Sequence, residues 1–461
     1  MRVLGLPARA CALIAKTRLH PDRSRTVIRL AYPVVLGMIS ITLLNVVDTA
    51  MLGRLGADPL AAAGISAVGY FAIVFSLAGI GIGVQTLTAR RYGEKKYRQC
   101  GEVLNAGLLL ALIAGIPFVA ASGWIANAIA PLLSHDPLVT ELGAVFLFYR
   151  FLGAPFLLFN MVYRGFFGGV GKTGQLMISA ILVTVINILL NYLLIFGHGG
   201  FPKMGIAGAA IASTIATGIG TVYFLLVSLS RSYRVQFRPY RSLTRSFFWF
   251  SPIVRLSLPV IGQRMIGNGS FFAFFSIVAR IGTLELAASS IIRSVIGLSI
   301  MPAIGIGVAA AALVGQNMGA KSAEQAEGLA WEGAKLAVYL MAAVGLLLIV
   351  FPRAIFSIYT ADPAVIALGR IPLILLGMTQ AFGGVALVIG QALQGAGNTR
   401  YVMLVELFVC SLLYLPLAYL LGLHLQLGII GAWTGEFVYW LAIALLVGWK
   451  FKRGTWKKIR V

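Results

Sequence analysis

Charged residues, acidic ones above all, are scarce in this chain of 461 residues. Only 11% of the residues are charged, 59% are hydrophobic, and 37 Lys and Arg stand against 14 Asp and Glu. A soluble globular chain is about half apolar and a quarter charged, so the composition excludes a soluble domain and indicates a polytopic membrane protein. At about 20 residues per spanning helix, a chain of this length holds roughly a dozen spans.

Cysteine and histidine are too few and too scattered to build a site. The three cysteines stand at positions 11, 100 and 410, and the four histidines fall in expected tails and loops. This pattern excludes a disulfide framework and a zinc site, and an enzyme with a cofactor is not expected because no catalytic cluster stands at one depth. The string GVGKT at 169–173 resembles the end of a phosphate-binding loop, but Phe166 stands where the required glycine would be, so no ATP site is expected.

The net charge of +23 does not indicate a nucleic-acid-binding protein, because the basic residues stand in the gaps between apolar runs. They gather at 90–98, 231–245 and 450–460, whereas the connections around His135 and His424 contain neither Lys nor Arg. The positive-inside rule places the basic connections, and with them both termini, in the cytoplasm. This requires an even number of spans.

Apolar runs broken by charges or by Gly, Pro and Asn predict an all-α protein with twelve transmembrane helices. The helices are expected at 27–50, 60–86, 101–123, 138–160, 175–196, 204–230, 253–277, 286–315, 329–350, 366–389, 400–421 and 428–449. The expected units are a basic tail over 1–25, an N-lobe over 26–229, a basic linker over 230–249, a C-lobe over 250–449 and a basic tail over 450–461. The first tail is either disordered or lies on anionic lipid.

The two halves of the chain are copies of each other. Gly93 corresponds to Gly319, and the Asp-Pro pair at 136–137 returns at 362–363, in each case 226 residues later. Because each half holds six spans, the two halves enter the membrane in the same orientation, as parallel repeats do. This pattern favours a two-lobed carrier with a central site between lobes that rock to give alternating access.

Asp48 is the only carboxylate in the first expected helix. It stands nineteen residues after Arg29, about 28 Å along a helix, where it is either a solvated acid at the membrane surface or a functional group. Asn45 lies one turn before it, and Asn187 and Asn191 form a similar pair on the fifth helix. A carboxylate with several amide oxygens suits Na⁺ or a proton, although membrane asparagines also simply bridge helices.

Several strings resemble the multidrug and toxic compound extrusion (MATE) family. They are VVDTAMLGRLGADPLAAAG in the first helix pair, YRGFFGGVGKTG and QALQGAGNTR at equivalent connections, and INILLNYLLIFG followed by MGIAGAAIAST. The resemblance covers nearly the whole chain after the tail. It implies a twelve-helix, two-lobed antiporter of the bacterial inner membrane that expels drug-like organic compounds against inward flow of Na⁺ or H⁺.

The same resemblance implies a cation site in the N-lobe. Carried over residue by residue, the site consists of Asp48, Asn187, Asn191 and Ser213. Some relatives have an acid where Asn191 stands, so the amide here favours H⁺ over tightly bound Na⁺. Apart from Na⁺ at Asp48, no metal is expected.

The C-lobe departs from the family pattern. Many relatives carry a Glu on the seventh helix and some an Asp on the tenth, whereas the matching positions here are Gly267 and Gly383, and Phe274 stands where the repeat would place a second Asp48. Ion coupling is therefore expected in the N-lobe alone.

Further residues are expected to face a central cavity. These are Asn45, Asn160, Gln263, Arg264, Asn268 and Phe271. Arg264 lies about half-way along its span, so it must face a cavity or a partner. It either sets the charge of the cavity or pairs with Glu406 or Glu436, and the pairing is the favoured interpretation.

The sequence thus predicts a monomeric antiporter in the lipid bilayer, with a small organic molecule as substrate and H⁺ or Na⁺ as coupling ion. The nearest alternative is a flippase for a lipid-linked saccharide or another amphiphile, which a strongly cationic cavity would favour. The alternative from another class is a membrane-embedded enzyme, which would need a catalytic cluster.

Overall fold

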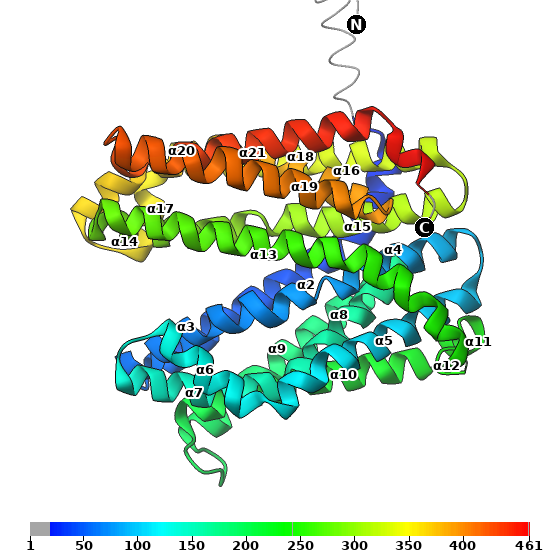
Figure 1. The fold of residues 1–461 in the computed structure, drawn as a ribbon, viewed down its shortest axis with the longest axis horizontal. Helices are drawn as coiled ribbons and strands as arrows, with labels where there is room; N and C mark the ends of the chain where they lie inside the picture. The colour runs from blue at the N-terminus through cyan, green and yellow to red at the C-terminus, as the bar shows by residue number, and fades with distance from the viewer. Residues whose placement is uncertain (1–18, 242, 460) are drawn as a thin grey trace, which may run out of the picture.

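The computed structural model describes residues 19–461 apart from 242 and 460, and these residues form helices and connections without a strand (Figure 1). The predicted all-α class is confirmed. Residues 1–18, most of the predicted N-terminal tail, lie outside the described residues. The first described helix begins at Pro21, earlier than the predicted start of the N-lobe at 26.

The first half of the chain forms the N-lobe, the lower body in Figure 1. Its helices are α2 (Pro21–Gly53), α3 (Ala57–Tyr70), the π-helical turn η2 (Phe71–Phe75), α4 (Ile80–Gly93), α5 (Tyr97–Ala120), α6 (Ser122–Leu133), α7 (Pro137–Leu152), α8 (Ala154–Gly169), α9 (Thr173–Phe196) and α10 (Gly205–Leu229).

The second half forms the C-lobe, the upper body in Figure 1, and short helices connect the two lobes. The connecting helices are α11 (Arg231–Gln236), α12 (Leu243–Ser246) and η3 (Phe247–Trp249). The C-lobe consists of α13 (Phe250–Ile281), α14 (Thr283–Ser299), α15 (Met301–Gly319), α16 (Ala323–Val350), α17 (Pro352–Tyr359), α18 (Pro363–Gly395), α19 (Thr399–Val409), η4 (Cys410–Tyr414), α20 (Leu415–Tyr419), η5 (Leu420–His424), α21 (Gly428–Lys452) and η6 (Thr455–Lys458).

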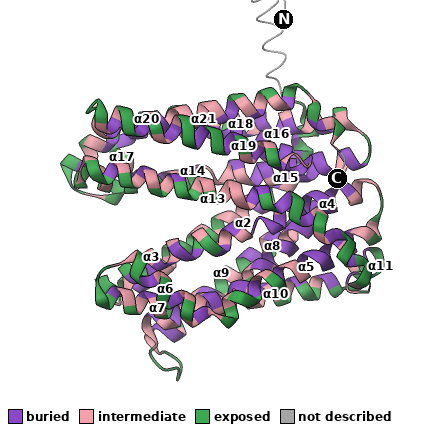
Figure 2. Cartoon of the chain, viewed as in Figure 1, coloured by how far each residue is buried: buried purple, intermediate pink, exposed green. Residues whose placement is uncertain are grey.

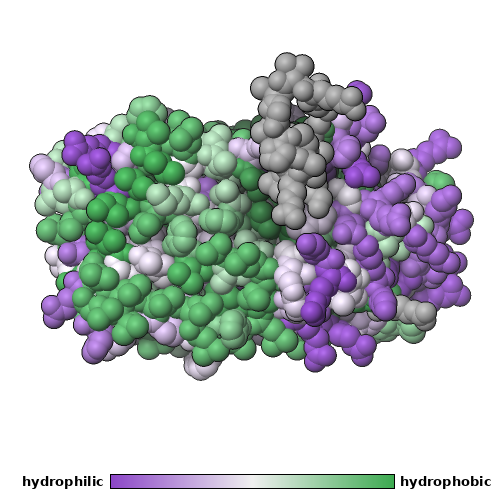
Figure 3. Space-filling model, turned by 90° about the horizontal axis from the view of Figure 1, so that it is seen from above, coloured by the Kyte–Doolittle hydropathy of each residue, from purple (hydrophilic) through white to green (hydrophobic). Residues whose placement is uncertain are grey.

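The two lobes meet at one end of the molecule and diverge toward the other (Figure 1). The end where they meet carries the connections at 90–98 and 231–245 and the end of α21, and it is called the basic end below. Figure 3 shows hydrophilic side chains gathered at this end and mostly hydrophobic ones over the rest of that face. Large apolar side chains are widely exposed, Trp124 by 76% and Leu132 by 82%, as expected for a surface that faces lipid.

Most of the predicted spans correspond to helices long and apolar enough to cross a membrane. Ten such helices occur among the described residues, and the pair α7 and α8, bent by 47°, would form an eleventh. Helix α13, which matches the seventh predicted span, is not among them. Its polar residues, Gln263, Arg264 and Asn268, lower its hydropathy.

The internal repeat appears in matching details of the two lobes. The Asp136 side chain accepts two backbone N–H groups of the first turn of α7, the Asp362 side chain accepts one of α18, and a proline occupies the first turn of both helices. Carboxylate caps followed by proline are favoured helix starts. The repeated Asp-Pro pair therefore fixes where the same helix begins in each lobe.

Glycine permits the lobes to approach each other closely at the basic end. A Cβ atom on Gly93 of α4 would collide with the backbone oxygen of Gln316 on α15, and one on Gly319 would collide with the backbone oxygen of Arg90. Figure 2 shows many buried residues where α4 and α15 meet. The repeat-related glycines thus form both sides of a tight contact between the lobes.

Candidate ion and substrate sites

A cavity of about 650 Å³ lies between the lobes. Helices α2, α4 and α8 of the N-lobe and α13, α15, α18, α19 and α21 of the C-lobe contribute to its walls. Most lining side chains are apolar or aromatic, including Phe71, Phe75 and Trp440. A mostly apolar cavity with a few polar groups is typical of a site for a small organic molecule.

Four of the residues that the sequence assigns to a cavity line this one. They are Asn45 of α2 and Gln263, Arg264 and Asn268 of α13. Polar side chains inside a membrane face cavities or partners because lipid cannot solvate them. The cavity wall thus receives polar side chains from both lobes, one from α2 and three from α13.

The predicted places of Asn160 and Phe271 are wrong, because neither lines the cavity. The amide nitrogen of Asn160 donates to the backbone oxygens of Phe156 (2.8 Å) and Thr217 (2.9 Å), so this side chain joins α8 to α10 inside the N-lobe. The ring of Phe271 lies against Phe275 and under the guanidinium of Arg293, 4.1 Å from its centroid.

The structure brings the four residues of the predicted cation site together. The side-chain nitrogen of Asn191 donates to Asp48 Oδ1 (2.5 Å) and to Asn187 Oδ1 (2.8 Å), and Asn187 donates to the hydroxyl of Ser213 (3.1 Å). Helices α2, α9 and α10 thus contribute to one polar network in the half of the N-lobe that lies away from the basic end. Asp48 itself does not line the cavity, but Asn45, one turn earlier on α2, does.

The oxygen atoms of this network suit a small cation. The side-chain oxygen of Asn191 is buried and has no hydrogen-bond partner among the described residues. It belongs to the amide whose nitrogen donates to the Asp48 carboxylate, and carboxylate, amide and hydroxyl oxygens are the ligands that hard cations prefer. The guanidinium of Arg150 interacts electrostatically with Asp48 and stacks on Tyr70 at 4.4 Å, so the carboxylate also has a distant positive neighbour. That this network binds H⁺ or Na⁺ stays a prediction.

The predicted pairing of Arg264 with Glu406 or Glu436 is wrong. No described carboxylate forms an ion pair with Arg264, whose guanidinium donates to the backbone oxygen of Phe75 (3.1 Å) and lies 5.0 Å from that ring. The chain breaks its helix beside Phe75, between η2 and α4. The Phe75 oxygen there accepts the N–H of Ala78 (3.2 Å), three residues later, in place of the regular helical partner four residues later. Arg264 therefore joins the C-lobe to the N-lobe across the cavity.

Glu406, which the sequence indicates only as a possible partner of Arg264, lines the cavity. It lies on α19 and accepts hydrogen bonds from the Tyr439 hydroxyl (2.7 Å) and the Gln263 amide (3.4 Å). Its carboxylate oxygen lies 3.4 Å from where a Cβ on Gly267 would be. Gly267 of α13 therefore carries no acid of its own, but the carboxylate of Glu406 on α19 lies next to it.

The cavity contains one more charged residue, Arg164 of α8, which sequence reasoning missed. No described residue forms an ion pair with it. Glu436, by contrast, lies outside the cavity lining and accepts a hydrogen bond from Trp440 Nε1 (3.0 Å). The cavity therefore combines two arginines with one carboxylate.

Hydrogen bonds between the lobes close the cavity toward the basic end. Thr86 donates to the backbone oxygen of Gln394 (3.0 Å), Gln85 to that of Val308 (3.1 Å) and Gln316 to that of Gly169 (2.7 Å). The lobes diverge in the opposite direction (Figure 1). The described state is therefore closed at the basic end.

Comparisons with known proteins agree with this architecture. A family model described as MatE matches residues 33–193 and 259–420. The multidrug resistance protein NorM of Burkholderia vietnamiensis is 31% identical over 435 residues, which are 93% of this chain and 93% of that protein. The probable multidrug resistance protein NorM of Thermotoga maritima is 26% identical over 95% of this chain and 94% of its own length.

Two solved structures share the fold. A MOP superfamily transporter from Pyrococcus furiosus, whose binding pocket is described as having reverse polarity, has a TM-score of 0.88 and 21% identity and covers 95% of this chain and 97% of its own. An outward-facing multidrug resistance MATE family transporter of the MOP superfamily has the same TM-score and identity and covers 96% of this chain and 98% of its own.

Proposed function

This chain belongs to the MatE family, and from that premise we propose that it is a secondary active antiporter. It exports organic, drug-like compounds in exchange for H⁺ or Na⁺, and Asp48 is the coupling carboxylate. It acts as a monomer in the bacterial plasma membrane with the basic end in the cytoplasm, and it needs neither ATP nor a catalytic site. The multidrug resistance names of its relatives support the substrate class.

The hydrogen-bonded network of Asp48, Asn191, Asn187 and Ser213 carries the proposal. It holds a carboxylate, an unpartnered amide oxygen and a hydroxyl within one lobe, next to the cavity and not inside it. An ion bound there leaves the cavity free for the substrate. Any change in the packing of α2, α9 and α10 reaches the cavity through Asn45, one turn from Asp48.

The transport cycle follows from this separation. In the state that is closed at the basic end, Asp48 takes up H⁺ or Na⁺ from outside, and the neutralised carboxylate no longer requires the same hydrogen bonds. The repacked helices release the substrate outward, after which the lobes rock, the ion leaves to the cytoplasm and a new substrate binds. The ion drives this sequence only because it binds the two states with different affinity.

Transport by purified protein in proteoliposomes tests the proposal. An imposed pH or Na⁺ gradient should drive ethidium movement by the wild-type chain, and Asp48→Asn should abolish it. Asp58→Asn is the matched control, since Asp58 is an exposed acid at the start of α3. Gradient-driven ethidium movement by Asp48→Asn at the wild-type rate would refute the role of Asp48.

A flippase for a lipid-linked saccharide or another amphiphile is the second candidate, and the two cavity arginines favour it. Arg164 and Arg264 would suit an anionic phosphate group, whereas Glu406 in the same cavity suits a cation. Competition separates the two functions: an organic cation should compete with ethidium, and a short-chain polyprenyl phosphate should not. The opposite ranking would support the flippase.

A further inference from the structure

A second cavity, of about 900 Å³, lies at the basic end between the start of α5 and the helices that connect the lobes. It is called the basic pocket below. Six cationic side chains line it: Arg91, Lys95, Lys96, Arg98, Arg238 and Arg245. None of them belongs to the central cavity or to the Asp48 network.

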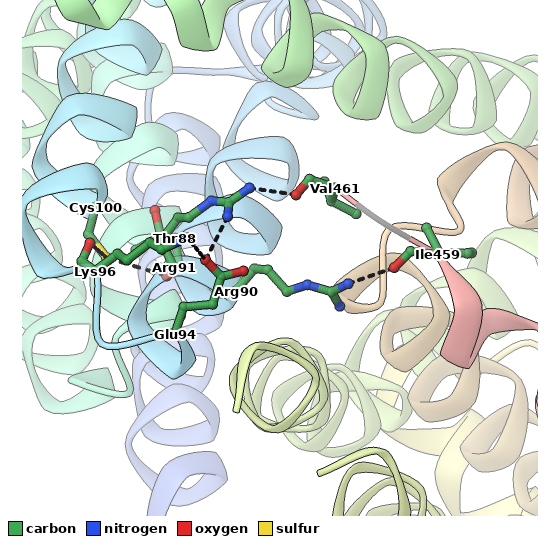
Figure 4. A network of polar contacts seen from close by, with 8 residues as sticks. All are labelled: Thr88, Arg90, Arg91, Glu94, Lys96, Cys100, Ile459 and Val461. Atoms are coloured by element: carbon green, nitrogen blue, oxygen red, sulfur yellow. Dashed lines mark hydrogen bonds and ion pairs between the residues drawn. The ribbon is translucent and has the colours of Figure 1, made fainter. Parts of the chain in front are cut away.

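Few carboxylates balance this charge. Among the described residues that line the basic pocket only Glu102 is acidic, and it pairs with Arg98 at 3.7 Å. Glu94, beside the pocket, pairs with Arg91 (2.7 Å) and Lys96 (2.9 Å) (Figure 4). The remaining lining cations, at 95, 238 and 245, form no ion pair with a described carboxylate.

The backbone adds to the positive potential of the pocket. Helix α5 begins at Tyr97, and no side chain caps its first N–H groups. Such groups carry the positive end of the helix dipole and bind anions. Because Tyr97 and Arg98 line the basic pocket, the start of the helix and the six cations act on the same space.

An apolar rim distinguishes the basic pocket from a site for a soluble anion. Phe248 and Val235 line it, although 77% and 68% of their surfaces are exposed. The buried Trp249 also lines the pocket, with the guanidinium of Arg91 5.2 Å from its ring. Helix α5, which is long and apolar enough to cross a membrane, begins at this pocket, and α13 begins directly after Trp249. This position corresponds to the depth of lipid headgroups, where cations beside exposed aromatic side chains suit an amphiphile.

We propose that the basic pocket binds the phosphate of an anionic phospholipid, whose acyl chains lie over Phe248 and Val235. A free phosphate would use the cations but not the apolar rim. The bound lipid joins the N-lobe turn at 94–96 to the connection between the lobes. Arg91 also donates to the main-chain oxygen of Val461 (2.6 Å), and Arg90 to that of Ile459 (2.6 Å) (Figure 4), so the lipid stabilises the closed arrangement of the basic end.

Native mass spectrometry of the full chain in detergent, titrated with phosphatidylglycerol or phosphatidylcholine of the same acyl chains, tests the proposal. The variant Lys95→Gln/Arg238→Gln/Arg245→Gln removes three pocket cations without breaking an ion pair between described residues. The control Lys172→Gln/Lys321→Gln/Arg400→Gln removes three exposed cations outside the pocket. Lys321 is the repeat counterpart of Lys95, with the same left-handed backbone (φ 60° and 61°).

The wild-type chain and the control should bind phosphatidylglycerol at least about tenfold more tightly than phosphatidylcholine, and the pocket variant should lose this preference. Arg245→Gln alone should reduce it by about fivefold, so the test holds even if the triple variant does not fold. Unchanged preference in the pocket variants would overturn the proposal. Equal competition by glycerol phosphate and by phosphatidylglycerol would overturn it too, because the site would then be one for a soluble phosphate.

Discussion

Gly93→Ala should open the basic end of the transporter. The added methyl group would meet the backbone oxygen of Gln316 in the other lobe, and a backbone atom cannot rotate away as a flexible side chain can. Relief of the overlap requires that α4 and α15 move apart. Gly319→Ala should act in the same way, because its methyl group would meet the backbone oxygen of Arg90.

The size of the effect follows from the cost of overpacking. Inserting a methyl group into a well-packed contact costs about 1–3 kcal/mol, and each 1.4 kcal/mol changes an equilibrium about tenfold. The state closed at the basic end should therefore lose roughly five- to 150-fold in population relative to the open state. Gly174→Ala and Gly448→Ala are matched controls, because no atom outside their own helix lies within 4 Å of the added methyl group.

The assay is the reactivity of a cavity cysteine toward a membrane-impermeant maleimide added from the basic side. Ile304→Cys places the thiol in the cavity wall, Cys11→Ser removes a native thiol, and the remaining Cys100 and Cys410 are buried. Gly93→Ala should raise the labelling rate of this cysteine several-fold. An unchanged rate in a folded Gly93→Ala variant, or an equal rise in Gly174→Ala, would refute the role of the glycine contact.

Two further predictions concern acidic residues. Glu406→Gln should raise the KM for organic cations about tenfold, since a hydrogen bond to a charged group contributes about 1.5–3 kcal/mol. Glu436 lies outside the cavity lining, so Glu436→Gln should leave this KM unchanged. Equal effects of the two substitutions would contradict the role of Glu406. Partial burial opposes the ionisation of Glu94, but hydrogen bonds from Lys96 and Arg91 outweigh it and hold the pKa of this carboxyl below its ordinary value. The ionised Glu94 therefore stabilises the folded chain above the ordinary carboxyl pKa, and this stabilisation is lost as the pH falls through the lowered pKa of the folded chain. Between about pH 7 and about pH 3, the melting temperature of Glu94→Gln should therefore fall less than that of the wild type. An identical fall would show that Glu94 contributes nothing.

The fold could be predicted from the sequence because hydrophobic runs, basic connections and the repeat all indicate the same architecture. The resemblance to the MATE family is confirmed. Only this resemblance assigned Ser213 to the N-lobe network, because the spacing of residues along the chain gives no sign of its contact with Asn187. Asp48 and Asn191 are 143 residues apart. Their contact depends on how α2 packs against α9, which the hydropathy of either helix does not determine.

The errors concern the direction of single side chains. Arg264 contacts a backbone oxygen at the break beside Phe75, and a sequence does not show which carbonyl groups such a break leaves available. Asn160 has the polarity of a cavity residue, but its amide satisfies backbone oxygens within its own lobe. Glu406 could have been found from its position as an acid in an apolar helix, although only the packing of α19 against Gly267 places it in the cavity.

Ion movement driven by the substrate tests most directly whether Asp48 couples ion and substrate. Proteoliposomes without an imposed ion gradient are given an ethidium gradient, and a pH-sensitive dye and ²²Na⁺ report which ion moves in the opposite direction. The wild-type chain and Asp58→Asn should move H⁺ or Na⁺ against the ethidium flux, and Asp48→Asn should move neither. Ion counterflow by Asp48→Asn at the wild-type rate would contradict the account.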